Sequence, residues 1–141
     1  MKKLSGLRLL IVEDDPELRE LVADGFSMSG GDVDTAEGGI KALEMIKTIQ
    51  YDFIVSDMRM PNGDARFLAK EILNLKDKKP LFFLYSGFND ITSQEAITLG
   101  IVQIFNKPFK ASEMMDSILS HLNPLKNIEK SISQHSPRGA R

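Results

Sequence analysis

Short runs of apolar residues alternate along the chain with longer stretches in which apolar residues recur every three or four positions. The runs are rich in isoleucine, leucine, valine and phenylalanine, as buried strands are, and the longer spacing is typical of amphipathic helices. We expect strands at 7–12, 33–35, 53–56, 81–85 and 102–105. We expect helices at 16–28, 38–49, 65–75, 91–99 and 112–122. Five such units favour an open, doubly wound α/β parallel sheet, since a closed barrel needs eight.

The ends of several expected helices carry specific residue types. Asp15 is a good N-cap, and Pro16 follows at the first helical position, where its missing N–H costs nothing. Gly100 stands where a left-handed C-cap is expected. By their spacing, Leu21 and Ile40 belong to the apolar faces of the first two helices.

The composition is that of one globular domain, with 141 residues, 42% of them hydrophobic and 27% charged. There is no cysteine, which excludes disulfides and thiolate zinc sites. Arg8 interrupts any signal-peptide core, and the longest apolar runs are far too short to span a bilayer. We therefore expect a cytoplasmic protein with no membrane segment.

The net charge is −2, so no overall positive field favours nucleic acid as a partner. Residues 124–141 hold four basic residues against one acid, and their composition predicts a mostly disordered basic tail after a domain of residues 1–123. Leu125, Ile128 and Ile132 are spaced for one face of a helix, so a short docking helix is the alternative.

Polar residues directly follow four of the expected strands, at the sheet edge where ligands bind in open α/β folds. Glu13, Asp14 and Asp57 are expected to converge there, because the first and third strands lie side by side. Three carboxylates repel one another, and either protonation of one acid or a bound divalent cation relieves this. Oxygen donors favour Mg²⁺ or Mn²⁺ over zinc. The alternative is that these acids only cap helices.

Two further strand ends add a hydroxyl, Ser86, and an ammonium group, Lys107. A carboxylate nucleophile, a metal ion, a hydroxyl and a lysine suit phosphoryl transfer, in which the protein aligns the groups and neutralises charge. Taken alone, each residue has a simpler explanation, as a turn residue or a solvated charge.

Four segments together resemble the receiver domains of two-component response regulators. They read IVEDDP at 11–16, VSDMRMP at 55–61, YSG at 85–87 and NKPF at 106–109. The resemblance covers residues 7–122 and implies a flavodoxin-like (βα)5 fold with strand order 2-1-3-4-5. It implies a signalling phosphoacceptor and not an enzyme acting on other substrates.

The resemblance also implies the roles of individual residues. Asp57 matches the aspartate that receives a phosphoryl group from a histidine kinase or a histidine phosphotransfer protein. Glu13 and Asp14 match the acidic pair that holds Mg²⁺ with Asp57, and the backbone carbonyl of Arg59 would complete the protein ligands.

The remaining site residues would contact the phosphoryl group. Lys107 matches the lysine that pairs with its oxygens, and Ser86 matches the hydroxyl that moves to meet them. Met58 and Gly87 are expected to bind beside it. The family usually has a cis bond at the position of Lys107-Pro108.

The chain departs from the usual receiver pattern at two places. Ile104 stands where a tyrosine or phenylalanine commonly swings inward on phosphorylation, and strand alternation points the neighbouring Phe105 to the opposite side. Arg59 and Phe88 flank the site at variable positions, and together they predict shielding of the acyl phosphate and slow self-dephosphorylation.

Several alternatives stay open from the sequence. The chain is either a stand-alone receiver or part of a longer regulator or hybrid kinase, and a docking-only pseudo-receiver is a further reading. A haloacid dehalogenase-type phosphatase is disfavoured because Met58 and Arg59 follow Asp57 without a second acid, and a flavodoxin-like cofactor binder because the first loop is acidic. The downstream protein partner is unknown. Phosphorylation-dependent pairing of two copies is left open, since four apolar residues suit either core or interface: Ile97, Met114, Met115 and Ile118.

Overall fold

The computed structural model describes residues 2–87 and 90–122, which form a five-stranded parallel sheet of order β2-β1-β3-β4-β5. The strands are β1 Arg8–Val12, β2 Asp32–Ala36, β3 Phe53–Asp57, β4 Leu81–Ser86 and β5 Ile101–Asn106. The helices are α1 Pro16–Met28, α2 Gly39–Thr48, α3 Ala65–Leu73, α4 Ser93–Thr98 and α5 Ala111–Leu122. The predicted fold class and strand order are confirmed.

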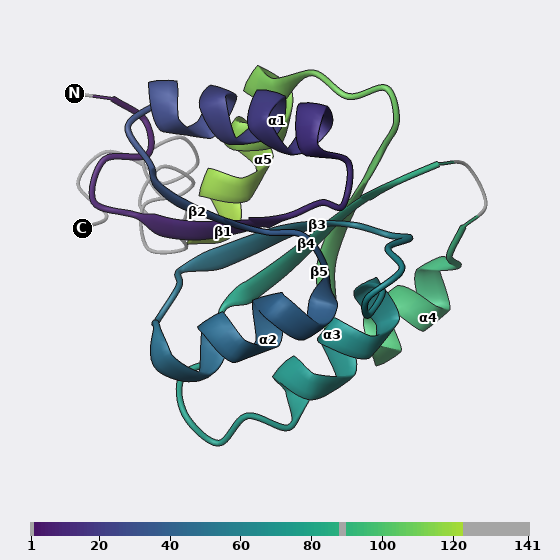
Figure 1. Cartoon of the computed structure of the whole chain (residues 1–141). Coiled ribbons are helices and arrows are strands. Elements are labelled where there is room, and N and C mark those ends of the chain that lie inside the picture. The colour runs from purple at the N-terminus through teal and green to yellow at the C-terminus, as the bar shows by residue number, and fades with distance from the viewer. Residues whose placement is uncertain (1, 88–89, 123–141) are drawn as a thin grey trace, which may run out of the picture.

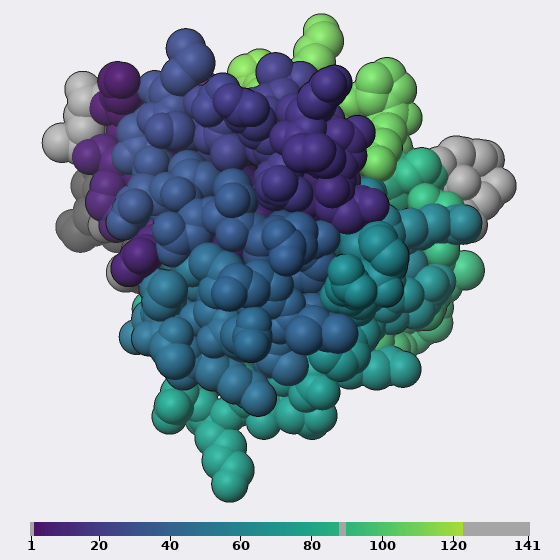
Figure 2. All heavy atoms as spheres, in the orientation of Figure 1, coloured from purple at the N-terminus to yellow at the C-terminus, as the bar shows by residue number. Residues whose placement is uncertain are grey.

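Helices cover both faces of the sheet. Helices α1 and α5 lie on one face, and α2, α3 and α4 lie on the other (Figure 1). Side chains fill the space between these ribbons, and the first half of the chain, coloured purple to blue, makes up most of the face turned to the viewer (Figure 2). The layers are those of a doubly wound sheet.

Strand alternation sorts the core into two clusters. In β4, Phe83 and Tyr85 pack on the side of α1 and α5, whereas Phe82 and Leu84 pack on the side of α2, α3 and α4. All four side chains are buried. Because the central strands are buried on both faces, they read as continuous apolar runs and not as alternating ones.

The capping residues act as predicted. The Asp15 carboxylate accepts hydrogen bonds from the N–H groups of Glu17 and Leu18 at the start of α1, and Gly100 has a φ of +75° after α4. Helix α4 begins at Ser93, later than predicted, because Thr92 caps it by accepting a hydrogen bond from the Glu95 N–H.

Two residues of the predicted apolar faces lie outside the core. Leu21 is 69% exposed and Ile40 is 55% exposed. Leu21 and Met28 line an apolar groove of about 550 Å³ that extends along α1 to Lys107 and Phe109. Helical spacing correctly predicted which side of α1 is apolar, but it did not predict how much of that side α5 covers.

The apolar residues of α4 and α5 divide between core and surface. Met114, Met115 and Ile118 are buried in the core, whereas Ile97 is 70% exposed. The predicted tail at 124–141 lies outside the described residues. Among the residues that are described, no helix is long and apolar enough to cross a bilayer.

Candidate functional site

The site lies at the carboxyl edge of the sheet, where strand register brings distant residues together. Val12 of β1 pairs with Ser56 of β3, so the next residues along, Glu13 and Asp57, lie at the same edge. Asp57 in turn pairs with Tyr85 of β4. The parallel register therefore fixes which polar side chains can meet.

Glu13 is a buried acid with a hydrogen bond on each carboxylate oxygen. Its side chain is 1% exposed; Oε1 accepts from the Tyr85 hydroxyl at 2.7 Å, and Oε2 accepts from the Asp15 N–H at 3.0 Å. Burial raises the pKa of Glu13, and the negative charge of Asp57 adds to this, while the hydrogen bonds from Tyr85 and Asp15 oppose it. Burial and the bond to Glu13 also raise the pKa of Tyr85. This corner of the site therefore favours a neutral phenol that donates a hydrogen bond.

Asp57 is held from two directions. Its Oδ1 atom accepts hydrogen bonds from the Met58 N–H at 2.9 Å and from the Lys107 ammonium at 2.9 Å. The Lys107 nitrogen also lies 5.3 Å from the centroid of the Tyr85 ring. A charge-assisted bond to an almost buried carboxylate fixes both groups in position.

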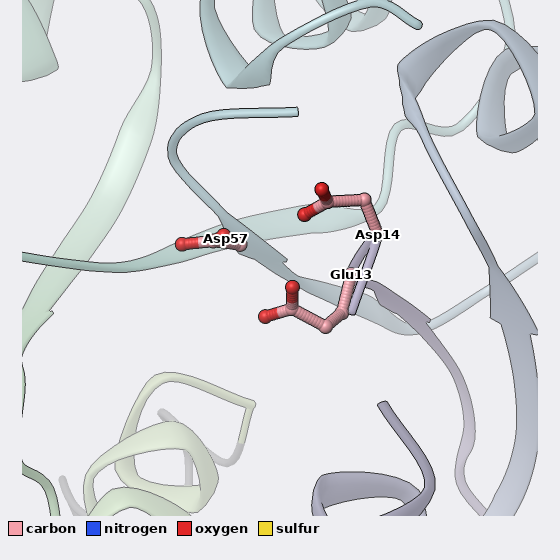
Figure 3. A group of neighbouring side chains, drawn as sticks. All are labelled: Glu13, Asp14 and Asp57. Atoms are coloured by element: carbon pink, nitrogen blue, oxygen red, sulfur yellow. The ribbon is translucent and has the colours of Figure 1, made fainter. Parts of the chain in front are cut away.

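Glu13, Asp14 and Asp57 form one acidic cluster, with a carboxylate oxygen from each within 4.8 Å of the others. All three carboxylates turn toward the same space (Figure 3). Glu13 and Asp57 are buried, so water does not screen their repulsion fully. Three hard oxygen donors at this spacing fit a small divalent cation such as Mg²⁺. The prediction that these three acids converge is confirmed.

Ser86 and Lys107 are joined through the backbone at the next strand ends. The Lys107 N–H donates to the Ser86 carbonyl at 2.9 Å, and the bond between Lys107 and Pro108 is cis, as the resemblance implied. The Ser86 side chain is buried, and its hydroxyl donates to the Gly87 carbonyl at 3.2 Å. The structure thus brings Lys107 onto Asp57, while the hydroxyl of Ser86 is engaged with its neighbour.

The flanking residues are arranged differently from one another. The Arg59 side chain is 80% exposed and its guanidinium pairs with Asp90 at 2.9 Å. Ile104 packs toward the cluster of α2, α3 and α4, and the half-buried Phe105 packs toward that of α1 and α5, so their predicted opposite orientation is confirmed. The shielding prediction also needs Phe88, which lies outside the described residues.

Two partners in this region were missed from the sequence. The Tyr85 hydroxyl that binds Glu13 is one, and the Asp90 carboxylate that binds Arg59 is the other. Tyr85 lies 72 positions after Glu13 along the chain, so no local signal in the sequence indicated the bond. The Asp90 contact depends on a loop conformation that periodicity does not report.

Comparison with known proteins adds to this geometry. The chain is 31% identical over 107 residues to Regulator of RpoS of Escherichia coli K12, a match over 76% of this chain and 32% of that protein. It is 27% identical over 125 residues to Regulatory protein AtoC of the same organism, over 89% of this chain and 27% of that protein. The chain thus spans about a third or less of the length of these relatives.

Solved structures with the same fold are matched over nearly their whole length. The receiver domain of Francisella response regulator 1452 superposes with a TM-score of 0.76 at 25% identity, over 85% of this chain and 99% of that one. A CheY-like receiver domain from Methylobacillus flagellatus gives a TM-score of 0.74 at 28% identity, over 84% and 98%. Residues 9–119 match the family described as "Response regulator receiver domain". With this match, the sheet order and the acidic cluster at its edge, the chain belongs to the response regulator receiver domain family.

Proposed function

We propose that the protein is a phosphoacceptor response regulator in which Asp57 receives a phosphoryl group from a histidine kinase or a histidine phosphotransfer protein. The observation that carries this proposal is the 2.9 Å contact between Lys107 Nζ and Asp57 Oδ1 beside two further acids. Receiver domains are phosphorylated by histidine kinases.

Phosphoryl transfer requires a nucleophile whose negative charge is partly balanced by neighbouring positive groups. An oxygen of the Asp57 carboxylate attacks phosphorus, an O–P bond forms, and the N–P bond to the donor histidine breaks with its electron pair on nitrogen. Glu13, Asp14 and Asp57 would hold Mg²⁺, with the Arg59 carbonyl as a further ligand. An ion held by these residues would supply positive charge beside the transferred oxygens. The Lys107 ammonium, already 2.9 Å from Asp57 Oδ1, would offset charge on the same oxygens.

Phosphorylation would then change the surface near α4 and β5. The Ser86 hydroxyl would leave the Gly87 carbonyl and donate to a phosphoryl oxygen. Because Ile104 replaces the usual aromatic residue, we assign the switch to a shift of Ser86 and Gly87 at the end of β4, near which Ile97 is already exposed. That surface would bind or release a downstream protein, or pair with a second copy of this chain.

The test is labelling of the full chain with acetyl phosphate, with and without Mg²⁺, followed by intact mass. We expect a gain of one phosphoryl group that requires Mg²⁺ and is lost in Asp57→Asn. The matched control is Asp77→Asn, an exposed aspartate outside the site, which should label like the wild type. Labelling that persists in Asp57→Asn would contradict the assignment of the acceptor. Failure of the wild type to accept phosphate from both acetyl phosphate and phosphoramidate, and to bind beryllofluoride, would favour the docking-only alternative.

A further inference from the structure

The residue after Ser86 has its backbone N–H already engaged. The Gly87 N–H donates to Asp90 Oδ2 at 3.0 Å, and the other oxygen of the same carboxylate accepts from Arg59 Nη2 at 2.9 Å. The Asp90 side chain is only 18% exposed, while that of Arg59 is 80% exposed. Asp90 thus bonds the segment after β4 to the one after β3 through both of its carboxylate oxygens.

A second arginine holds the same residue by its backbone. Arg66 of α3 donates from Nη2 to the Asp90 carbonyl at 3.0 Å and pairs with Glu95 of α4 through Nε and Nη2. The Arg66 and Glu95 side chains are each 37% exposed. Asp90 is therefore fixed at its carbonyl as well as at its carboxylate.

A phosphoryl group on Asp57 would compete for the donor that Asp90 holds. Asp57 pairs in register with Tyr85, so Ser86, the last residue of β4, and Gly87 directly after it are the first residues beyond that pair. A phosphoryl group brings close to two negative charges and three strong acceptor oxygens. One of these oxygens would accept a hydrogen bond from the Gly87 N–H, and the negative charge of the phosphoryl group would repel the Asp90 carboxylate.

We propose that Asp90 is a positioning residue: it holds the Gly87 N–H while Asp57 is unphosphorylated and must release it when Asp57 carries a phosphoryl group. This inference rests on the proposed function. Asp90 then sets the balance between the two positions of the Gly87 N–H group, and Arg59 keeps the Asp90 carboxylate in place. Release would free the Arg59 guanidinium, two residues from Asp57.

The absence of a side chain at Gly87 supports this proposal. A Cβ atom at position 87 would lie 3.3 Å from Asp90 Oδ2, tighter than ordinary van der Waals contact. The backbone of Gly87 is not in the left-handed region, so its conformation does not demand glycine. The requirement is the close approach of the Asp90 carboxylate, and Gly87→Ala would push that oxygen away by a few tenths of an ångström.

The test compares binding of beryllofluoride with Mg²⁺, a stable phosphoryl mimic, to the full chain labelled with ¹⁵N. We expect Asp90→Ala to bind about tenfold more tightly than the wild type, because a charge-assisted bond no longer has to break. Its free Gly87 amide resonance should also move away from the wild-type position. Asp90→Asn keeps an acceptor oxygen for Gly87 and should fall between the two.

Asp77→Asn is the matched control, since it removes one negative charge from an exposed aspartate outside the site and leaves Asp90, Arg66 and Gly87 untouched. We expect less than a twofold change in affinity from it. Equal affinity of Asp90→Ala and wild type, or equal tightening by Asp90→Ala and Asp77→Asn, would overturn the proposal. If Asp90→Ala fails to fold, Gly87→Ala provides a second variant. We expect Gly87→Ala to bind beryllofluoride more tightly than the wild type, by a smaller factor than Asp90→Ala. An unchanged affinity of Gly87→Ala would contradict the proposal. A wild type that neither binds beryllofluoride nor labels with acetyl phosphate would instead overturn the proposed function.

Discussion

The two faces of the sheet are held by different forces. On the face of α1 and α5, aromatic rings contact one another in series, with Phe53 6.0 Å from Phe26 and 6.0 Å from Phe83 between centroids. On the face of α2, α3 and α4, aliphatic side chains, alanines and methionines make up most of the core, together with the rings of Tyr51 and Phe82, and the ion pair between Arg66 and Glu95 links α3 to α4. One face is joined by packing, and the other adds directional polar bonds between helices.

This difference indicates which part of the molecule can move. Tightly packed rings leave no alternative arrangement of similar energy, whereas hydrogen bonds and ion pairs can exchange partners. Helix α4 has six residues, of which only Ala96 is buried, so its position depends strongly on Arg66 and on the segment before it. The face of α1 and α5 therefore acts as the fixed reference, and α4 is where charge at the site can have an effect.

Truncating the central ring should produce the largest effect. Phe83 contacts the rings of Phe53, Phe105 and His121, so Phe83→Ala should lower the free energy of unfolding by about 3–5 kcal/mol. Phe82→Ala is the control on the opposite face, because Phe82 is equally buried and makes no ring contact among the described residues. We expect its loss to be smaller by about 1 kcal/mol. Equal losses in urea denaturation would remove the distinction between the faces.

The Tyr85 hydroxyl connects the ring-packed face to the acidic cluster, and its removal should have an intermediate effect. Tyr85→Phe leaves one oxygen of the buried Glu13 carboxylate without its donor, which should cost about 1–3 kcal/mol at neutral pH. Tyr51→Phe is a close control: the Tyr51 hydroxyl donates at the same distance, 2.7 Å, to Asp34, a partly exposed carboxylate that water can reach. If urea denaturation showed a larger loss of unfolding free energy in Tyr51→Phe than in Tyr85→Phe, burial of the Glu13 carboxylate would not be what makes the Tyr85 bond important.

Breaking the ion pair that holds α4 should have the smallest effect on stability and a specific pH dependence. The hydrogen bond from Arg66 lowers the pKa of Glu95 below its ordinary value of 4.5. The pair therefore stabilises the fold above that value, and its contribution is lost as the pH falls through the lowered pKa. We expect Arg66→Gln to destabilise the domain slightly at neutral pH and not in acid, where Glu95 is protonated. A ¹³C titration of the Glu95 carboxyl should show its midpoint rising in the variant, and an unchanged midpoint would contradict the pairing.

The sequence predicted the parts of the molecule that depend on local chemistry. Helix α1 begins at Pro16 as predicted because its cap and its first residue are both written in neighbouring positions. The acidic cluster was predicted because parallel register brings strand ends to one edge, whatever the loops do. The bond from Asp90 to Gly87 was not predicted, since it depends on the course of a loop, and neither was the exposure of Leu21, which depends on how far another helix extends.

The single backbone bond from the Lys107 N–H to the Ser86 carbonyl has a mechanical consequence. It links Lys107, which would contact the phosphoryl group, to Ser86, which would move toward that group, so the ends of β4 and β5 are coupled through the backbone. A displacement of Ser86 toward Asp57 would pull on the end of β5 and the segment leading into α5 at the same time. Motion at the site would then be transmitted to both β5 and α5 through the backbone.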